Sequence, residues 1–168
     1  YHLREKVATC RYSISGFPSL YMGTALALCV EESIQKSDRL FIGSKFQMNR
    51  STRDNGNINI QVMDLSIKPQ DFLKVPGVDG NVFYSQQDGD DLAHRYLYWY
   101  PLIAACSFIR KSKNDPFSPE YIIPQLLMQW VREQYVKSSH HEELVGIRYF
   151  SCASRKAAEL GFNYVFPV

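Results

Sequence analysis

Two charged side chains lie within or just after segments that are otherwise uncharged, which makes them candidates for chemistry. Arg11 falls within VATCRYS, a segment whose other residues carry no charge. Glu32 comes one residue after Glu31 at the end of the apolar run ALALCV and, at helical spacing, shares a face with Leu28 and Cys29. A charge on an apolar face costs free energy unless it is paired or used in binding. The two residues therefore form either a structural ion pair or part of a functional site.

Two further groups of residues could take part in chemistry, a pair of serines and a pair of histidines. We predict a site role for the serines only. Ser151 and Ser154 follow GIRYF, a segment typical of a strand, although a serine there could also be an ordinary strand-end hydroxyl. His140 and His141 precede two glutamates, but adjacent residues seldom bind one metal ion together. A polar loop explains that segment better, and we predict no metal site.

The overall composition argues against several classes of function. The formal net charge is +2 and no long basic run occurs, so we expect no nucleic-acid partner. No apolar run reaches the roughly 18 residues that a membrane span requires, so we expect no membrane insertion. The four cysteines form no C-x-x-C pair, which favours free thiols in a reducing compartment. We therefore predict a cytoplasmic protein.

The hydrophobic pattern predicts a mixed domain of strands and helices. Strands are predicted at residues 7–13, 20–22, 39–46, 58–65, 145–150 and 163–168. Helices are predicted at residues 25–35 after Thr24, at residues 92–100, and at residues 119–136 after Ser118. Residues 77–91 indicate a long loop, and the apolar run at residues 102–109 slightly favours a strand.

Two of the predicted helices carry apolar faces that should lie in the core. The helix at residues 25–35 is apolar nearly all round in its first two turns, which predicts burial. The helix at residues 119–136 carries an apolar stripe at helical spacing, made of Ile123, Leu126, Leu127, Trp130 and Val131. We expect Trp99 and Trp130 to be core residues.

Three separated segments resemble the RES family in the same order along the chain. RYSISGFPSLYMGTALALCVEES is similar to that family's core of an Arg, a Tyr and a Glu around a glycine turn and a helix. DPFSPEYIIPQLLMQW and the pair GIRYFS and FNYVFPV resemble a group of longer, standalone members. The resemblance implies one RES-like domain over residues 1–168 that lacks some N-terminal residues. It also implies an α/β (α+β) fold like that of ADP-ribosyltransferases, with curved, largely antiparallel sheets and packed helices.

The family takes its name from an Arg, a Glu and a Ser, which by motif are Arg11, Glu32 and Ser151 in this chain. The resemblance implies NAD⁺ as the substrate and Tyr21 as an aromatic wall or stacking partner of the nicotinamide, although Tyr21 could also be plain core. Glu31 is the alternative to Glu32, and Ser154 is the alternative to Ser151. The family also uses an earlier arginine, for which Arg4 is the only upstream candidate.

These residue types suit cleavage of the bond between nicotinamide and ribose, which passes through a cation-like ribose state. A carboxylate such as Glu32 can bind a ribose hydroxyl and face the developing positive charge. The guanidinium of Arg11 matches phosphate oxygens, and Ser151 can offer a hydroxyl to the nicotinamide amide or the ribose.

The acceptor decides whether such an enzyme is a glycohydrolase, a phosphorylase or an ADP-ribosyltransferase. The resemblance implies a bacterial toxin of a toxin–antitoxin pair, or a defence protein, with an antitoxin protein as partner. The alternative is a catalytically silent RES-like module that binds a nucleotide or a partner protein.

Overall fold

A single sheet of four strands organises the part of the chain that the structure describes. The computed structural model describes residues 6–33, 40, 42–47, 59–68, 86–110, 117–137 and 142–168. The strands are β1 (Ser19–Gly23), β2 (Asn59–Leu65), β3 (Glu142–Phe150) and β4 (Phe162–Pro167). The helices are α1 (Leu26–Ser33), α3 (Gln86–Ser107), α4 (Ile122–Lys137) and α5 (Arg155–Leu160), with a short 3-10 turn, η2 (Pro119–Tyr121), before α4.

The strand order is β1-β4-β3-β2, and most of the pairing is antiparallel. β4 pairs antiparallel with β1 on one side and with β3 on the other, while β2 pairs parallel with β3. A parallel pair needs a long crossover connection, which here includes α3 and α4. The predicted mixed α/β class with a largely antiparallel, open sheet is therefore confirmed.

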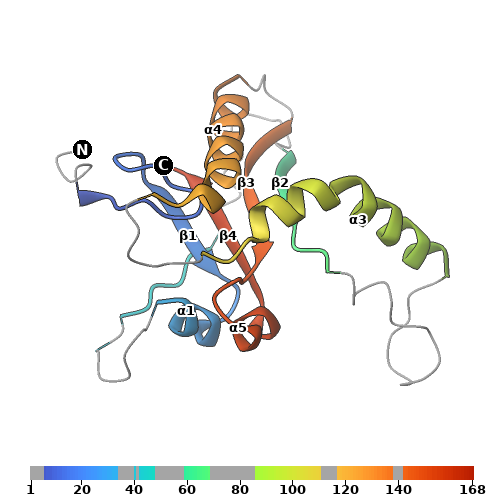
Figure 1. The fold of residues 1–168 in the computed structure, drawn as a ribbon, viewed down its shortest axis with the longest axis horizontal. Helices are drawn as coiled ribbons and strands as arrows, with labels where there is room; N and C mark the ends of the chain where they lie inside the picture. The colour runs from blue at the N-terminus through green and yellow to red at the C-terminus, as the bar shows by residue number, and fades with distance from the viewer. Residues whose placement is uncertain are drawn as a thin grey trace.

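Helices cover one face of the sheet and one of its ends. α4 packs against β3 and β4, and α3 leads away from β2 (Figure 1). α1 and α5 lie side by side at the end of the sheet where β1 ends and β4 begins (Figure 1). Among the helices that the structure describes, none combines the length and the apolar character needed to cross a bilayer.

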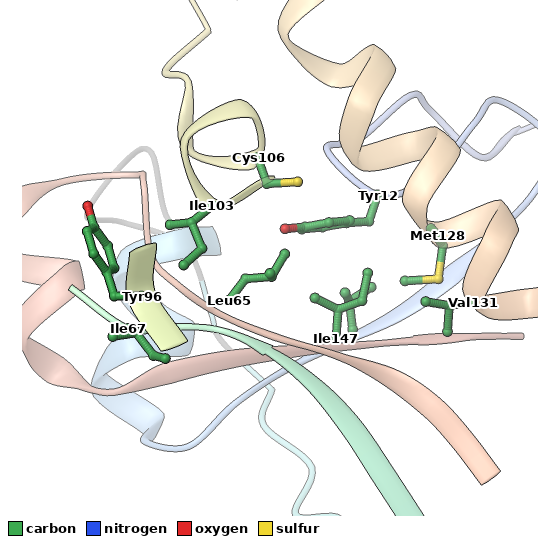
Figure 2. Close-up of a cluster of buried hydrophobic side chains, with 10 residues drawn as sticks. Tyr12, Leu65, Ile67, Tyr96, Ile103, Cys106, Met128, Val131 and Ile147 are labelled. Atoms are coloured by element: carbon green, nitrogen blue, oxygen red, sulfur yellow. The ribbon is translucent and has the colours of Figure 1, made fainter. Parts of the chain in front are cut away.

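The core lies between the sheet, α4 and the last turns of α3 (Figure 2). Tyr12 sits at its centre with 0% of its surface exposed. The other fully or nearly buried apolar residues come from all three layers: Leu65, Ile67, Tyr96, Ile103, Cys106, Met128, Val131, Ile147 and Val165.

The strand predicted at residues 7–13 is wrong, because this segment forms a tight turn. The backbone N–H of Cys10 donates to the oxygen of Ser13 at 3.0 Å, and the N–H of Ser13 donates back at 3.2 Å. Arg11 and Tyr12 occupy the tip of the turn. Burial of the large Tyr12 ring favours this geometry over an extended strand, because the turn drives the ring into the core.

The strand favoured at residues 102–109 is also wrong, because α3 continues through Pro101 to Ser107. Ile103 and Cys106 reach the core at helical spacing, so packing decides in favour of the helix. The helix also begins at Gln86, inside the stretch predicted as a long loop. Residues 40 and 42–46 form no strand, contrary to the prediction for that segment.

The helices predicted near residues 25–35 and 119–136 are present, but their buried faces differ from the expectation. In α1 only Leu28 is buried, so the helix is not apolar core all round. Among residues 122–134 of α4, the buried ones are Pro124, Met128 and Val131. Leu126 is 59% exposed and Trp130 is 45% exposed, so Trp130 is not a core residue. Trp99 packs partly buried against the core.

The burial pattern of α4 predicts unequal costs for two similar truncations. Met128→Ala should lower the free energy of unfolding by about 2–5 kcal/mol, because it opens a cavity in the core. Leu126→Ala on the same helix should change it by less than about 1 kcal/mol, because that side chain is already largely in water. Chemical denaturation of both variants measures the difference, and equal losses would contradict the observed face.

Arg11 holds the carboxyl end of α3 against the turn at residues 10–13. Its Nη1 donates to the backbone oxygen of Cys106 at 2.8 Å and to that of Phe108 at 2.9 Å. The last carbonyls of a helix lack partners within the helix and carry partial negative charge. A guanidinium is well suited to satisfy them, so Arg11 links two segments that are 95 residues apart in sequence.

Loss of this link should destabilise the fold measurably. Arg11→Ala should lower the unfolding free energy by about 2–3 kcal/mol, because two charge-assisted hydrogen bonds disappear. Arg155 is a suitable control, because its ion pair with Glu159 is almost fully in water. Arg155→Ala should leave the denaturation midpoint unchanged within error. A midpoint for Arg11→Ala equal to that of the control would refute the assigned role.

Candidate functional site

The register of the sheet brings several polar side chains to one end of its inner face. Tyr149 of β3 lies directly opposite Asn163 of β4, and Tyr21 of β1 lies opposite Val165. Directly opposed residues, and residues two apart on one strand, share a face. Tyr21, Tyr149 and Asn163 therefore lie on the face that also carries the buried Val165 and Ile147.

Two hydrogen bonds between Thr24 and Phe162 join the end of β1 to the start of β4 at this end of the sheet. The N–H of Thr24 donates to the oxygen of Phe162 at 3.0 Å, and the N–H of Phe162 donates to Thr24 Oγ1 at 2.9 Å. The chain enters β4 at Gly161, whose φ of 151° favours glycine. These contacts fix α1 and α5 beside the strand ends.

Glu32 is anchored on β4 by a hydrogen bond from Asn163. The Nδ2 of Asn163 donates to Glu32 Oε1 at 2.7 Å, and Asn163 is only 6% exposed. Glu32 itself lies at the surface, so its second oxygen has access to solvent or a ligand. A short bond to a buried amide holds the carboxylate in one place.

Glu31, the alternative to Glu32, faces α5 instead. Its Oε1 accepts a hydrogen bond from Ser154 Oγ at 3.2 Å, and its Oε2 lies 3.4 Å from Lys156 Nζ. Ser154 is the N-cap of α5 and accepts a hydrogen bond from the N–H of Ala157 at 3.0 Å. Glu31 and Ser154 thus link two helices, which leaves Glu32 and Ser151 as the candidates for chemistry.

Arg11 borders the same end of the sheet from the α3 side. Besides its bonds to α3, its guanidinium carbon lies 5.3 Å from the centre of the Tyr121 ring. Its positive charge lowers the pKa of both the Tyr149 phenol and the Cys152 thiol, against the larger effect of burial, which raises both. Arg11 therefore lies close enough to act electrostatically on the residues around the end of β3.

Tyr21 is held by its hydroxyl rather than by its ring. The hydroxyl accepts a hydrogen bond from the N–H of Tyr12 at 2.9 Å and shares a second bond of 3.0 Å with Ser13 Oγ. Burial raises the pKa of Tyr21 to about 12, although the bonds with Ser13 and Tyr12 act in the opposite direction. The residue is 38% exposed, so part of it remains open for a ligand.

Tyr149 lies opposite Asn163, which holds Glu32, and no pattern in the sequence singled it out. Burial is the first cause that raises its pKa well above the ordinary value. Tyr21 and Glu32 raise the pKa further, whereas Arg11 lowers it. The predicted arginine, tyrosine and glutamate therefore all act on this one phenol. The alternation of Ile147 and Tyr149 in the strand could have indicated that Tyr149 faces inward.

Ser151 and Cys152 follow Tyr149 at the end of β3. Ser151 is 2% exposed, and its Oγ accepts a hydrogen bond from the N–H of Ala153 at 3.1 Å, while its own O–H donates to none of the residues that the structure describes. Burial raises the pKa of the Cys152 thiol, Arg11 lowers it and Glu32 raises it. The net rise keeps Cys152 a neutral thiol, which is a poor nucleophile.

Arg4, His140 and His141 lie outside the described residues. Within the described ranges, no three or more His, Cys, Asp and Glu side chains gather in a way that could hold a metal ion. A hollow of about 340 Å³ lies between β2 and α3, away from the predicted site residues, and is lined by Gln61, Val62, Met63, Asp64, Ile67, Arg95, Trp99 and Leu144.

The chain is similar over nearly its whole length to a protein of Bacillus subtilis (strain 168) named "Putative toxin YopC". The two are 31% identical over 169 residues, which is 98% of this chain and 35% of the relative. The chain thus spans about a third of the length of that protein. No protein-family model matches the chain, and no solved structure matches it. The resemblance to the RES family and the likeness to ADP-ribosyltransferases therefore stay predictions.

Proposed function

We propose that this chain is a toxin domain that cleaves the bond between nicotinamide and ribose in NAD⁺. The observation that carries the proposal is the hydrogen bond that fixes Glu32 on Asn163, on the sheet face that also carries Tyr21 and Tyr149. The charge of Arg11 acts on the Tyr149 phenol from the α3 side. Similarity to a protein whose name describes a toxin supports the biological part of the proposal.

Glu32 is the group proposed to act at the reacting carbon. When the bond breaks, its electron pair passes to the nicotinamide nitrogen, which is cationic in NAD⁺, and neutral nicotinamide leaves. The ribose becomes cation-like and is captured by water, phosphate or a protein side chain. A carboxylate fixed by Asn163 and open to solvent on its other side suits the stabilisation of this charge.

Arg11 is proposed to bind the phosphates of the substrate. Only its Nη1 is used for the carbonyls of α3, and its Nε and Nη2 donate to none of the described residues. Two remaining donors on a planar group match a phosphate. Tyr21 is proposed to line the nicotinamide pocket, and Ser151 is proposed to donate its O–H to the nicotinamide amide or the ribose.

The activity of such a toxin has to be inhibited in the cell that makes it, because it would consume that cell's own NAD⁺. We therefore also propose an antitoxin protein as partner. The name of the relative supports a toxin role and does not identify the partner. Co-expression of the chain with candidate neighbouring proteins, scored by rescue of growth, tests this part.

Glu32→Gln should lower nicotinamide release from NAD⁺ by roughly a hundredfold or more, a size typical for loss of one preorganised electrostatic group. The neutral amide can still accept the Asn163 bond, so the fold should persist. Glu31→Gln is the matched control and should stay within about twofold of the wild type, because Glu31 contacts α5. Chromatography of free nicotinamide, with water, phosphate or added protein as acceptor, measures the rates.

Two outcomes would contradict the proposal. Equal rates for Glu32→Gln and wild type would remove Glu32 from the reaction. Wild-type protein that binds NAD⁺ but releases no nicotinamide with any acceptor would favour a nucleotide-binding module without catalysis.

A further inference from the structure

We infer that the hydroxyl of Tyr149 is a further substrate-contacting group, which donates a hydrogen bond to the ribose diol that Glu32 binds. The inference rests on the proposed function and deepens it, because it names a second residue for recognition of the ribose next to nicotinamide. No motif in the sequence assigned this residue a role.

The first support is the position of Tyr149 beside the anchor of Glu32. Tyr149 and Asn163 are directly opposed across the antiparallel pair of β3 and β4. Side chains at such positions share a face and have Cβ atoms about 4.5–5.5 Å apart. Since Asn163 holds Glu32 at 2.7 Å, the phenol of Tyr149 and the carboxylate of Glu32 flank the same buried amide.

The second support is that the Tyr149 hydroxyl has no hydrogen-bond partner among the residues that the structure describes. The nearby Tyr21 hydroxyl, by contrast, is engaged by both Tyr12 and Ser13. Tyr149 is half-buried, and a polar group in such a place is usually satisfied by protein, water or a ligand. The hydroxyl is therefore available to a bound molecule.

The third support is the complementary chemistry of the two groups. A phenol is protonated at neutral pH, and the raised pKa of Tyr149 moves it further from ionisation, so its hydroxyl can donate a hydrogen bond. An ionised carboxylate such as that of Glu32 only accepts. A vicinal diol presents donors and acceptors on adjacent carbons, so it can bind a neighbouring donor and acceptor together.

The ring of Tyr149 is held in place by the core. Its centroid lies 4.9 Å from that of Tyr12, with an angle of 53° between the rings. Tyr12 is completely buried, and its hydroxyl lies beside the Cys106 thiol inside the core (Figure 2). The pair therefore consists of one completely buried phenol and one partly buried phenol that lies opposite Asn163.

This pair allows a matched experiment in which each variant loses one hydroxyl and keeps its ring. Tyr149→Phe should lower kcat/KM for nicotinamide release roughly tenfold or more, as expected for loss of one substrate hydrogen bond. Tyr12→Phe should stay within about twofold of the wild type, because its hydroxyl is completely buried in the core and out of reach of a bound molecule. Both variants should keep the fold, which circular dichroism and thermal melting check.

A binding measurement separates recognition of the ribose from catalysis. ADP-ribose carries the terminal ribose, whereas ADP lacks it. In calorimetric titrations, Tyr149→Phe should weaken ADP-ribose binding roughly tenfold and leave ADP binding unchanged.

One outcome would overturn this inference while the proposed function stands. In it, the wild-type protein is active, and Tyr149→Phe keeps full activity and unchanged ADP-ribose binding. Equal weakening of ADP and ADP-ribose would overturn it as well, because the effect would then not concern the terminal ribose. Wild-type protein that neither releases nicotinamide nor binds ADP-ribose would overturn the proposed function and this inference together.

Discussion

Burial of Tyr12 is the interaction on which the arrangement of fold and site depends. The ring fills the centre of the core between the sheet, α3 and α4, and packs against Tyr149. Because Tyr12 points inward from a tight turn, the neighbouring Arg11 lies at the carboxyl end of α3. The backbone N–H of Tyr12 donates a hydrogen bond to the Tyr21 hydroxyl. One buried ring thus sets the position of an arginine and two tyrosines that come from different parts of the chain.

Local pattern predicted much of the secondary structure and failed where packing decided. The strands that contain Tyr21, Val62, Ile147 and Val165 were predicted, because alternation and flanking turns mark them. The turn at Arg11 and Tyr12 was read as a strand, because nothing local distinguishes a buried turn from an extended segment. The apolar run after Pro101 was ambiguous between strand and helix for the same reason, and α5, which is only six residues long, was missed.

The candidate site was likewise predictable from local sequence only in part. The sequence marks Arg11 as a charge among uncharged residues and Glu32 as a charge on the apolar face of a helix, and the resemblance to the RES family adds Tyr21. The position of Glu32 beside Tyr149 depends on strand register and on the Asn163 bond, which no spacing in the sequence encodes. Alternation in the strand indicates that Tyr149 faces inward, but only the pairing of β3 with β4 shows that it lies opposite Asn163, which holds Glu32.

The two adjacent glutamates of α1 place a constraint on the phase of that helix. Glu31 contacts Lys156 of α5, and Glu32 accepts a hydrogen bond from Asn163 of β4. Only one rotation of α1 about its axis allows both contacts. Each added or deleted residue would turn the following part of a helix by about 100°. A single insertion between Gly23 and Glu31 would therefore misdirect both carboxylates at once, whereas many substitutions along the exposed side of α1 would leave them in place. Among homologues, this segment should vary in composition while its length stays constant.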